Sequence, residues 1–492
     1  MNKLRIFCIV MWGLLGLVYG QRSNIVARLD LGKNDPKPEF YEYSPIDQGL
    51  ITLGPMSRIS SRYIGLRKYD RGLRQEWETR VLEQSERKTI DFVSIVGQYI
   101  FVFVSESFPK EGVIKSYYYE YDLDGNQIVE REILSVYPLE KEQKVELQYV
   151  LSPNKRKLLC FKNLRNKRDT EEILYYLFDD EGDYIQSGEI SLRYPDNRFR
   201  VRNVRVSNQG NVFVLGKFTL RNRVRDTDDY KYIVYRHDAA TQTGREIAVD
   251  LGDRYISDLA FRLDRDDNMY LAGFYSNRST YQIVGTLFQK VSPTGEILMN
   301  STEKFGENFL SNYLSGGQID RGRELKNFYL DPEDGIILRS DGGVLLLAEK
   351  FYVTNRPYRD IYGYWVNRDV FHYEDVILTS INGNGEIEWH AIVDKNQIGE
   401  SPANLSYFNA IGGSGNFIFY EYKPRRNKVN VYYNAVGIGG EVSNRQPLFA
   451  DYRFGNEFYP RFCEQVDNNT AIMVYFQSRG KKLSVVKVQF EG

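Results

Sequence analysis

The feature that most constrains this chain is a strand-and-turn pattern that recurs along most of its 492 residues. The clearest copy runs from Ile256 to Phe305, where four apolar runs are separated by turn residues such as Ser292–Gly295. Short runs rich in β-branched and aromatic residues, bounded by Asp, Asn, Gly and Pro, are typical of strands joined by hairpins. Four such strands in about fifty residues predict an antiparallel meander the size of one propeller blade.

A glycine marks the turn before the last strand of each copy. Gly295 holds this place in the stretch above, and its equivalents are Gly72, Gly125, Gly182, Gly244, Gly385 and Gly440. Successive spacings are 53, 57, 62, 51, 90 and 55 residues, and Gly492 follows after a further 52. Hairpin turns favour glycine because one of their residues needs a positive φ. The regular spacing, with strands on both sides, indicates a repeated unit.

The last unit reaches Gly492 at the point where its fourth strand should begin, so that strand is expected from elsewhere. The segment Asn24–Gly32 (NIVARLDLG) resembles the fourth strand Glu246–Gly252 (EIAVDLG). Pairing it with the last unit would remove an exposed sheet edge. The sequence therefore predicts an all-β fold, a β-propeller of four-stranded blades closed by an N-terminal strand. Eight blades fit the spacing best, with seven or six as alternatives.

The N-terminus has the pattern of a secretory signal. Lys3 and Arg5 precede an apolar run from Ile6 to Val18, and Tyr19-Gly20 offers a cleavage site. We therefore expect residues 1–20 to be a signal peptide and 21–492 to form a single propeller domain. No later stretch approaches a membrane-spanning length. The expected location is periplasmic, outer-membrane-associated or extracellular.

The mature chain would keep two cysteines, because Cys8 leaves with the signal. The repeat register assigns Cys160 to the third blade and Cys463 to the eighth. Those blades are further apart than the Cα limit of about 7 Å for a disulfide. The sequence thus predicts two free, buried thiols.

The spacing of 90 residues between Gly295 and Gly385 is longer than the others because this unit contains two insertions, residues 306–333 and 353–374. We expect both to rise side by side over one sector of one propeller face. The second is rich in aromatic and basic side chains, which form either a contact surface for a sugar, peptide or protein or a cap of rings buried against each other. The candidate contact residues are Tyr358, Tyr362, Tyr364, Trp365 and His372, with Arg356 and Arg359 as partners for anionic groups.

The composition gives little support for catalysis. The three histidines are widely spaced, which argues against a zinc enzyme, and we predict no metal, cofactor or catalytic residue. A net charge of −1 argues against nucleic acid as a partner. The alternative is a carbohydrate-active enzyme, a glycoside hydrolase or lyase, with carboxylates converging at the propeller funnel. The acids nearest the insertions are Glu307, Asp331, Asp334 and Glu349.

Two units carry a family resemblance. The segments Asp341–Val393 and Asn208–Ile247 look like the secreted β-propeller repeats common in Bacteroidota, and are similar to the eight-bladed quinoprotein-like superfamily. Units of that superfamily carry TG-x-x-x-W at the fourth strand, which Glu386–Trp389 and Leu73–Trp77 fit. The other units lack the tryptophan, so a full ring of tryptophan contacts is not expected.

The resemblance implies the fold and no quinone cofactor. Non-enzymatic members of the superfamily are envelope scaffolds and binding modules. The expectation is an exported, non-enzymatic binding or scaffold protein of the bacterial cell envelope, which recognises a glycan or a protein partner through one decorated face.

Overall fold

The computed structural model describes most of the chain, namely residues 23–32, 35–44, 46–139, 147–164, 170–195, 198–219, 230–249, 254–277, 282–331, 335–359, 361–425, 428–448, 456–477 and 482–490. The predicted signal peptide lies outside these residues. The α-helices in the described part are α2 (Glu307–Leu310) and α3 (Gly316–Asp320). Neither helix is long enough to cross a membrane.

Six sheets are four-stranded antiparallel meanders. The first two contain β2 (Phe40–Tyr43), β3 (Leu50–Pro55), β4 (Tyr63–Tyr69), β5 (Gln75–Glu83), and β6 (Lys88–Val96), β7 (Tyr99–Phe108), β8 (Val113–Asp122), β9 (Gln127–Pro138). The next two contain β10 (Gln148–Leu151), β11 (Lys157–Leu164), β12 (Glu171–Asp179), β13 (Tyr184–Leu192), and β14 (Phe199–Val206), β15 (Val212–Thr219), β16 (Tyr230–Asp238), β17 (Thr243–Val249). The last two contain β18 (Tyr255–Leu263), β19 (Met269–Ser276), β21 (Gly285–Val291), β22 (Ile297–Lys304), and β30 (Tyr407–Gly412), β31 (Gly415–Arg425), β32 (Lys428–Gly437), β33 (Gln446–Pro447).

The remaining sheets depart from this plan. One contains β24 (Phe328–Leu330) and β25 (Ile336–Leu338), which both pair with β26 (Val344–Arg359), followed by β27 (Trp365–Ile381), β28 (Ile387–Val393) and β29 (Gln397–Gly399). Another contains β34 (Asn456–Phe458), β35 (Glu464–Asp467), β36 (Thr470–Gln477), β37 (Lys482–Phe490) and β1 (Ser23–Leu31), with the 3-10 turn η1 (Pro460–Phe462) before β35. A two-stranded ladder joins β20 (Gln282–Ile283) to β23 (Leu325–Lys326).

The two ends of the described chain meet in one sheet. Strand β1 pairs antiparallel with β37, from Asn24 opposite Gln489 to Leu31 opposite Leu483. Its Asp30 accepts a hydrogen bond of 2.5 Å from the Ser484 hydroxyl. The segment Asn24–Gly32, which was predicted to pair with the last unit, therefore supplies the outermost strand of the last sheet.

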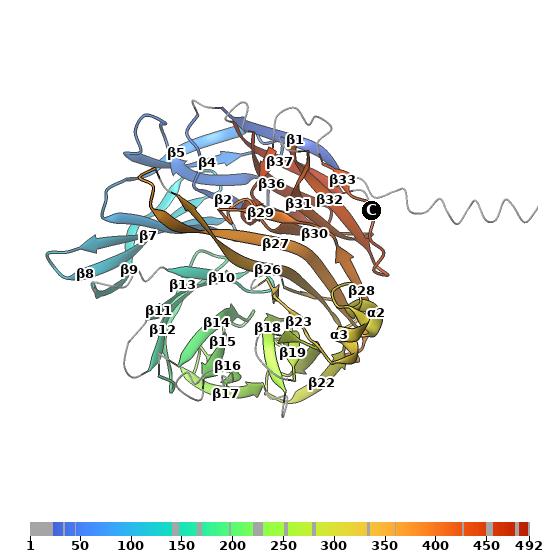
Figure 1. Cartoon of the computed structure of the whole chain (residues 1–492). Coiled ribbons are helices and arrows are strands. Elements are labelled where there is room, and N and C mark those ends of the chain that lie inside the picture. Colours follow the sequence, from blue (N-terminus) through green and yellow to red (C-terminus); the bar gives the residue numbers. More distant parts are fainter. Residues whose placement is uncertain are drawn as a thin grey trace, which may run out of the picture.

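Each sheet packs face to face on its neighbours around a common centre (Figure 1). A core cluster joins Ile51 of β3 to Val102 of β7, and another joins Tyr69 of β4 to Val485 of β37. Middle strands such as β19 are buried along their whole length, as expected of strands covered on both faces, whereas outer strands such as β5 expose alternate residues. The fold is an all-β propeller.

The repeated glycines lie in tight turns before the outer strands. Gly125, Gly182, Gly295, Gly385 and Gly440 have φ between 82° and 88°. In the first and fourth sheets the positive φ falls instead on neighbouring residues, Leu73 (60°) and Gln242 (55°). The turn geometry thus recurs even where glycine does not supply it.

Two of these glycines also lie under tryptophans of the preceding sheet. A Cβ on Gly125 would come within 2.9 Å of the Trp77 ring, and one on Gly440 within 2.7 Å of Trp389. Trp77 Nε1 further donates to the Leu123 carbonyl at 3.1 Å. The two tryptophans singled out in the sequence therefore each connect one sheet to the next, although the full ring of such contacts is not made.

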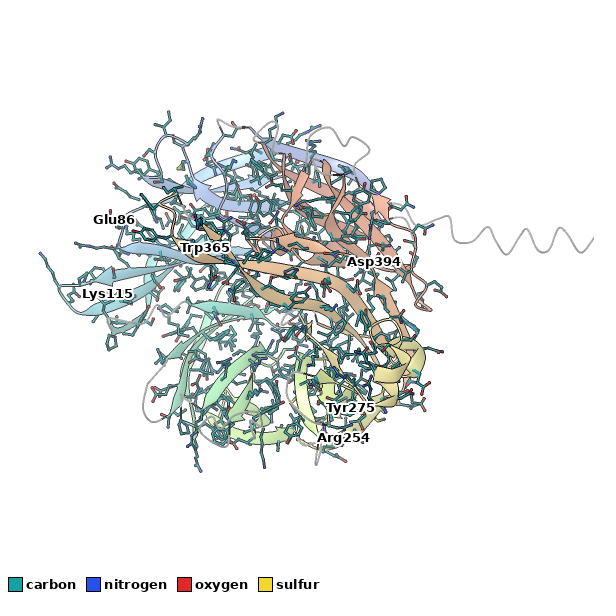
Figure 2. All side chains as sticks on the ribbon, viewed as in Figure 1. Glu86, Lys115, Arg254, Tyr275, Trp365 and Asp394 are labelled. Carbon is teal, nitrogen blue, oxygen red and sulfur yellow. The ribbon has the colours of Figure 1, made fainter. Side chains whose placement is uncertain are left out.

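The prediction that the two insertions lie side by side is wrong. Residues 306–333 form α2, α3, β23 and β24, and Phe309 of α2 packs on His390 of β28 at 4.4 Å between ring centroids. Residues 353–374 instead extend β26 and β27 into one long hairpin, which runs about 50 Å at 3.3 Å per residue. Figures 1 and 2 show α2 beside β28 and Trp365 at the other end of the hairpin.

Candidate functional site

The aromatic insertion is a regular hairpin rather than a coiled loop. Strands β26 and β27 stay in register out to Tyr358 opposite Val366 and Arg359 opposite Trp365. The alternation of aromatic, β-branched and polar residues in both arms suits a two-stranded ribbon. The ladder fixes which side chains reach the tip.

Four aromatic rings gather at this tip. Tyr362, Tyr364 and Trp365 are 78%, 71% and 67% exposed, and Tyr358 is also exposed. The interpretation of these rings as a buried cap is therefore wrong for the tip. Large rings left in water at the end of an ordered hairpin are typical of contact surfaces.

Arginines accompany these rings. Arg359 lies over the Trp365 ring with its Cζ 5.2 Å from the centroid, and Arg368 lies over Tyr358 at 4.1 Å. Arg368 also pairs with Glu400 at 2.5 Å. The exposed Arg356 lies opposite Arg368 in the ladder. The tip therefore combines flat apolar surfaces with guanidinium groups, two of which are ordered by the rings beneath them.

His372 does not belong to this surface. It is buried, stacks on the Tyr352 ring at 4.5 Å between centroids, and its Nε2 lies 2.8 Å from Thr354 Oγ1. Tyr352 in turn donates to Glu374 at 2.7 Å. His372 belongs to β27, and its partners Tyr352 and Thr354 belong to β26. The histidine therefore connects the two arms of the hairpin below the tip.

A buried ion pair fixes the base of the hairpin. Glu349 of β26 pairs with Lys395 and accepts a 2.6 Å hydrogen bond from the Ser406 hydroxyl, which belongs to the segment before β30. Lys395 also donates to Gln397 Oε1 at 2.9 Å. Burial raises the pKa of Glu349, with the charge of Lys395 opposing it. The hairpin is thereby tied to the connection into the next sheet.

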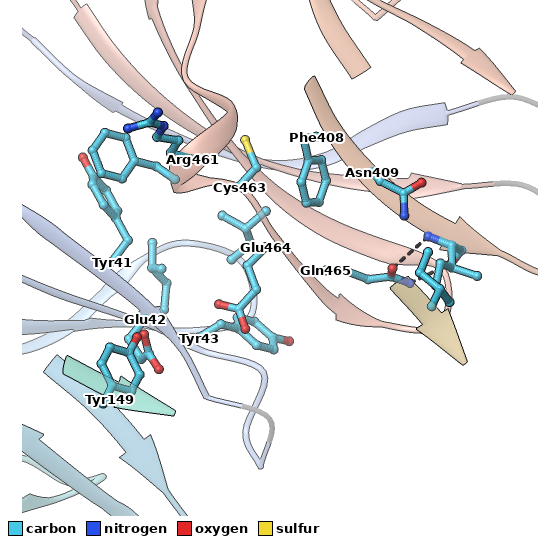
Figure 3. A pocket seen from close by; sticks show the side chains of 15 residues that line it. Tyr41, Glu42, Tyr43, Tyr149, Phe408, Asn409, Arg461, Cys463, Glu464 and Gln465 are labelled. Carbon is cyan, nitrogen blue, oxygen red and sulfur yellow. Dashed lines mark hydrogen bonds between the residues drawn. The ribbon is translucent and has the colours of Figure 1, made fainter. Parts of the chain in front are cut away.

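A second candidate lies where the innermost strands of several sheets converge. A cavity of about 460 Å³ is lined by β2, β10, β25, β30, η1 and β35. Figure 3 shows Glu42 from β2 and Glu464 from β35 reaching into this space, with Tyr149 beside Glu42 and Tyr43 beside Glu464. Because the first and last sheets are neighbours, two carboxylates far apart in sequence share one cavity.

The environment of Glu42 disfavours its charge. Burial raises its pKa well above the usual value, and the charge of Glu464 raises it further. Hydrogen bonds from the Ile95 backbone and the Tyr149 hydroxyl act in the opposite direction. Burial likewise raises the pKa of the Cys463 thiol and of the Tyr41 hydroxyl, which line the same cavity. Burial and the nearby like charge therefore both disfavour the ionised form of Glu42 in the absence of a positive charge beside it.

Sequence reasoning missed Glu42 and Glu464. The signal was present, because both are charged residues inside short first strands, FYEY and CEQVD, where apolar or small residues would be expected. First strands of a propeller line its centre, and the first and last blades are adjacent once the ring closes. Those two facts together would have placed the pair.

Two of the acids that the sequence nominated lie near each other, because the charge of Asp331 adds to the raised pKa of Glu349. Glu349 is engaged with Lys395, and Glu307 is exposed on α2 at the rim. Asp331 follows β24, and Asp334 lies outside the described residues. Within the described part of the chain, no cluster of three or more His, Cys, Asp or Glu side chains could hold a metal ion.

Both described cysteines are free, as predicted. Cys160 is fully buried in β11. Cys463 is half-buried beside η1, where its Sγ lies 3.3 Å from the Tyr459 carbonyl. The repeat register therefore placed both thiols correctly.

Comparisons with other proteins find only distant structural likeness. No protein-family model and no curated protein matches the chain. Among solved structures, the WD40 domain of SCAP from fission yeast is similar at 9% identity and a TM-score of 0.42, covering 96% of this chain and 95% of its own. The propeller domain of the Trilobed protease from Pyrococcus furiosus is similar at 10% identity and a TM-score of 0.34, and the match covers 82% of this chain and 96% of that one. The polysaccharide lyase Uly1 is similar at 8% identity and a TM-score of 0.35, and the match covers 82% of this chain and 90% of that one. At these values the likeness carries no functional argument.

Proposed function

We propose that this chain is an exported, non-enzymatic binding protein of the bacterial cell envelope that recognises an acidic glycan through the tip of the β26–β27 hairpin. Its residues 21–492 act as one domain, a ring of eight blades closed by β1. The ring serves as a rigid base from which the hairpin presents its rings and arginines.

One observation carries the proposal, which is the exposure of Tyr362, Tyr364 and Trp365 on an ordered hairpin. Sugar rings offer apolar C–H faces to flat aromatic rings, and such rings bind with little loss of side-chain entropy. Arg356 and Arg359 add guanidinium groups, which match the geometry of carboxylate and sulfate groups. An acidic polysaccharide uses both kinds of contact.

The anchored base supports the same proposal. The Glu349–Lys395 pair and the stacked His372 hold the two arms in one arrangement before any ligand arrives. A contact surface that is already ordered loses less entropy on binding. The hairpin is thus suited to recognition.

The test is binding of the purified protein to polygalacturonate, with a neutral β-glucan as the comparison, followed by product analysis. Changing Tyr364 and Trp365 together to alanine should weaken binding at least tenfold. Ile361→Ser, at an exposed apolar position of the same tip, should change it less than twofold. Equal binding by the double variant would refute the proposal. Shortened chains in the product would instead favour a glycoside hydrolase or lyase, and capture of an envelope protein that competes with the glycan would favour a protein partner.

A further inference from the structure

Two residues that line the pocket between the innermost strands each have a buried polar atom without a hydrogen-bond partner. Tyr43 is 6% exposed, lines the cavity, and its hydroxyl has no hydrogen-bond partner. Asn409 also lines the cavity, and its buried Oδ1 likewise has no partner. A buried polar atom without a partner costs free energy, so such atoms at a cavity wall point to a bound group.

Carboxyl groups stand out among the polar side chains that line the pocket. Glu42 and Glu464 bring carboxylate oxygens, and Asn409 Oδ1 adds an acceptor. Arg461 also lines the cavity, but its guanidinium is engaged by the Tyr373 hydroxyl of the hairpin. Two carboxyl groups in one cavity favour a ligand with a positive charge and N–H donors.

The carbon walls suit an organic ligand. Tyr41 and Phe462 lie 5.6 Å apart between ring centroids, and Phe408 and Tyr149 complete the aromatic lining. A volume of about 460 Å³ lies within the range of small-molecule sites. Among the described side chains, two carboxylates without a third His, Cys, Asp or Glu ligand form a poor metal site.

We propose that this pocket binds a small organic cation, with an ammonium or guanidinium group held between Glu42 and Glu464 and its carbon chain against the aromatic walls. The raised pKa of Glu42 agrees with this arrangement, because a bound cation would offset both its burial and the charge of Glu464. This inference does not rest on glycan recognition at the hairpin tip.

The test is isothermal titration calorimetry of the full-length protein with 1,4-diaminobutane and agmatine, each at up to 5 mM. The uncharged 1,4-butanediol, similar in length to the diamine, is the matched ligand control. We expect one of the cations to bind with a 1:1 stoichiometry, and the diol to bind at least tenfold more weakly. Agmatine has one ammonium and one guanidinium group, so binding of agmatine without binding of the diamine would identify a guanidinium site.

Variants locate the binding. Glu42→Gln and Glu464→Gln keep the side-chain shape and should each weaken binding at least tenfold, and Tyr43→Phe, which removes only the unpartnered hydroxyl, should weaken it two- to fivefold. Glu307→Gln, an exposed acid on α2, should have no effect. An unchanged melting temperature in the Tyr43→Phe protein keeps its result interpretable even if a glutamate variant folds poorly.

Three outcomes would overturn the inference. These are no binding of either cation at 5 mM, equal binding of the diol, and equal binding by the three pocket variants. The variant with Tyr364 and Trp365 changed to alanine should still bind the cation, so failure at the hairpin tip and failure at this pocket can be told apart.

Discussion

The hairpin tip and the central pocket differ in how the sequence builds them. The tip consists of neighbours in the chain, since Tyr358 and Trp365 are seven residues apart and lie in one ladder. The pocket brings together Glu42 and Glu464, from the first and last sheets, only when those sheets meet. A local surface can change without disturbing the fold, whereas the pocket depends on the contact between the first and last sheets. The following experiments test this difference.

The largest effect should come from deleting residues 24–32, which include all of β1 except Ser23. The deletion leaves β37 as an unpaired edge and weakens the contact between the first and last sheets, so we expect a loss of more than about 4 kcal/mol in the free energy of unfolding. Urea denaturation measures it. Deleting residues 361–364 at the tip should cost less than about 1 kcal/mol. A β1 deletion as stable as the parent would refute the closed ring.

The next effect concerns the base of the hairpin. Lys395→Met leaves Glu349 buried without its partner and should cost about 3–5 kcal/mol. Changing Glu349 to Leu as well should restore most of the stability, since a buried ion pair can be replaced by apolar side chains. If the double variant is no more stable than Lys395→Met alone, the ion pair is not the cause.

A smaller effect depends on pH and reports on the packing of α2. Burial lowers the pKa of His390, which contacts Phe305 and Phe309, to about 4. Between pH 6.5 and 4 the unfolded chain binds more protons at this site, so stability falls by about 3 kcal/mol as the pH drops through that window. His390→Phe should remove this component of the pH dependence. An unchanged pH profile in that variant would contradict the assignment.

The smallest effect on stability belongs to the tip. Changing Tyr364 and Trp365 to alanine should alter the free energy of unfolding by less than about 0.5 kcal/mol, because both side chains are exposed. Thermal melting measures it, alongside the binding assay described above. A loss above 2 kcal/mol would show that the tip supports the fold, which would remove the contrast with the pocket.

The sequence predicted the repeat well because turn and strand patterns are local. The turn positions of Gly125, Gly295 and Gly440 and the free state of Cys160 and Cys463 followed from the repeat spacing, and the pairing of the N-terminal segment followed from its likeness to a fourth strand. Register is a one-dimensional property that a single chain displays directly. The propeller fold could be predicted for the same reason, because its blades repeat one local strand-and-turn pattern.

The sites were harder to predict, because they depend on direction and distance. Residues 353–374 read as an aromatic loop, yet cross-strand pairing makes them a hairpin that turns His372 inward and carries Trp365 away from α2. The pairing of Glu42 with Glu464 depends on the meeting of the two chain ends. Neither arrangement is visible in a hydrophobic pattern.

The pairing of β1 with β37 also has a consequence for synthesis. Asp30 and Ser484, which are hydrogen-bonded, are 454 residues apart, so a growing polypeptide cannot form this contact until Ser484 has been made. Contacts of such long range form late in folding. A prematurely terminated product would keep an open sheet edge, which invites aggregation or degradation. The order of synthesis thus makes the β1–β37 ladder one of the last parts of the described fold to form.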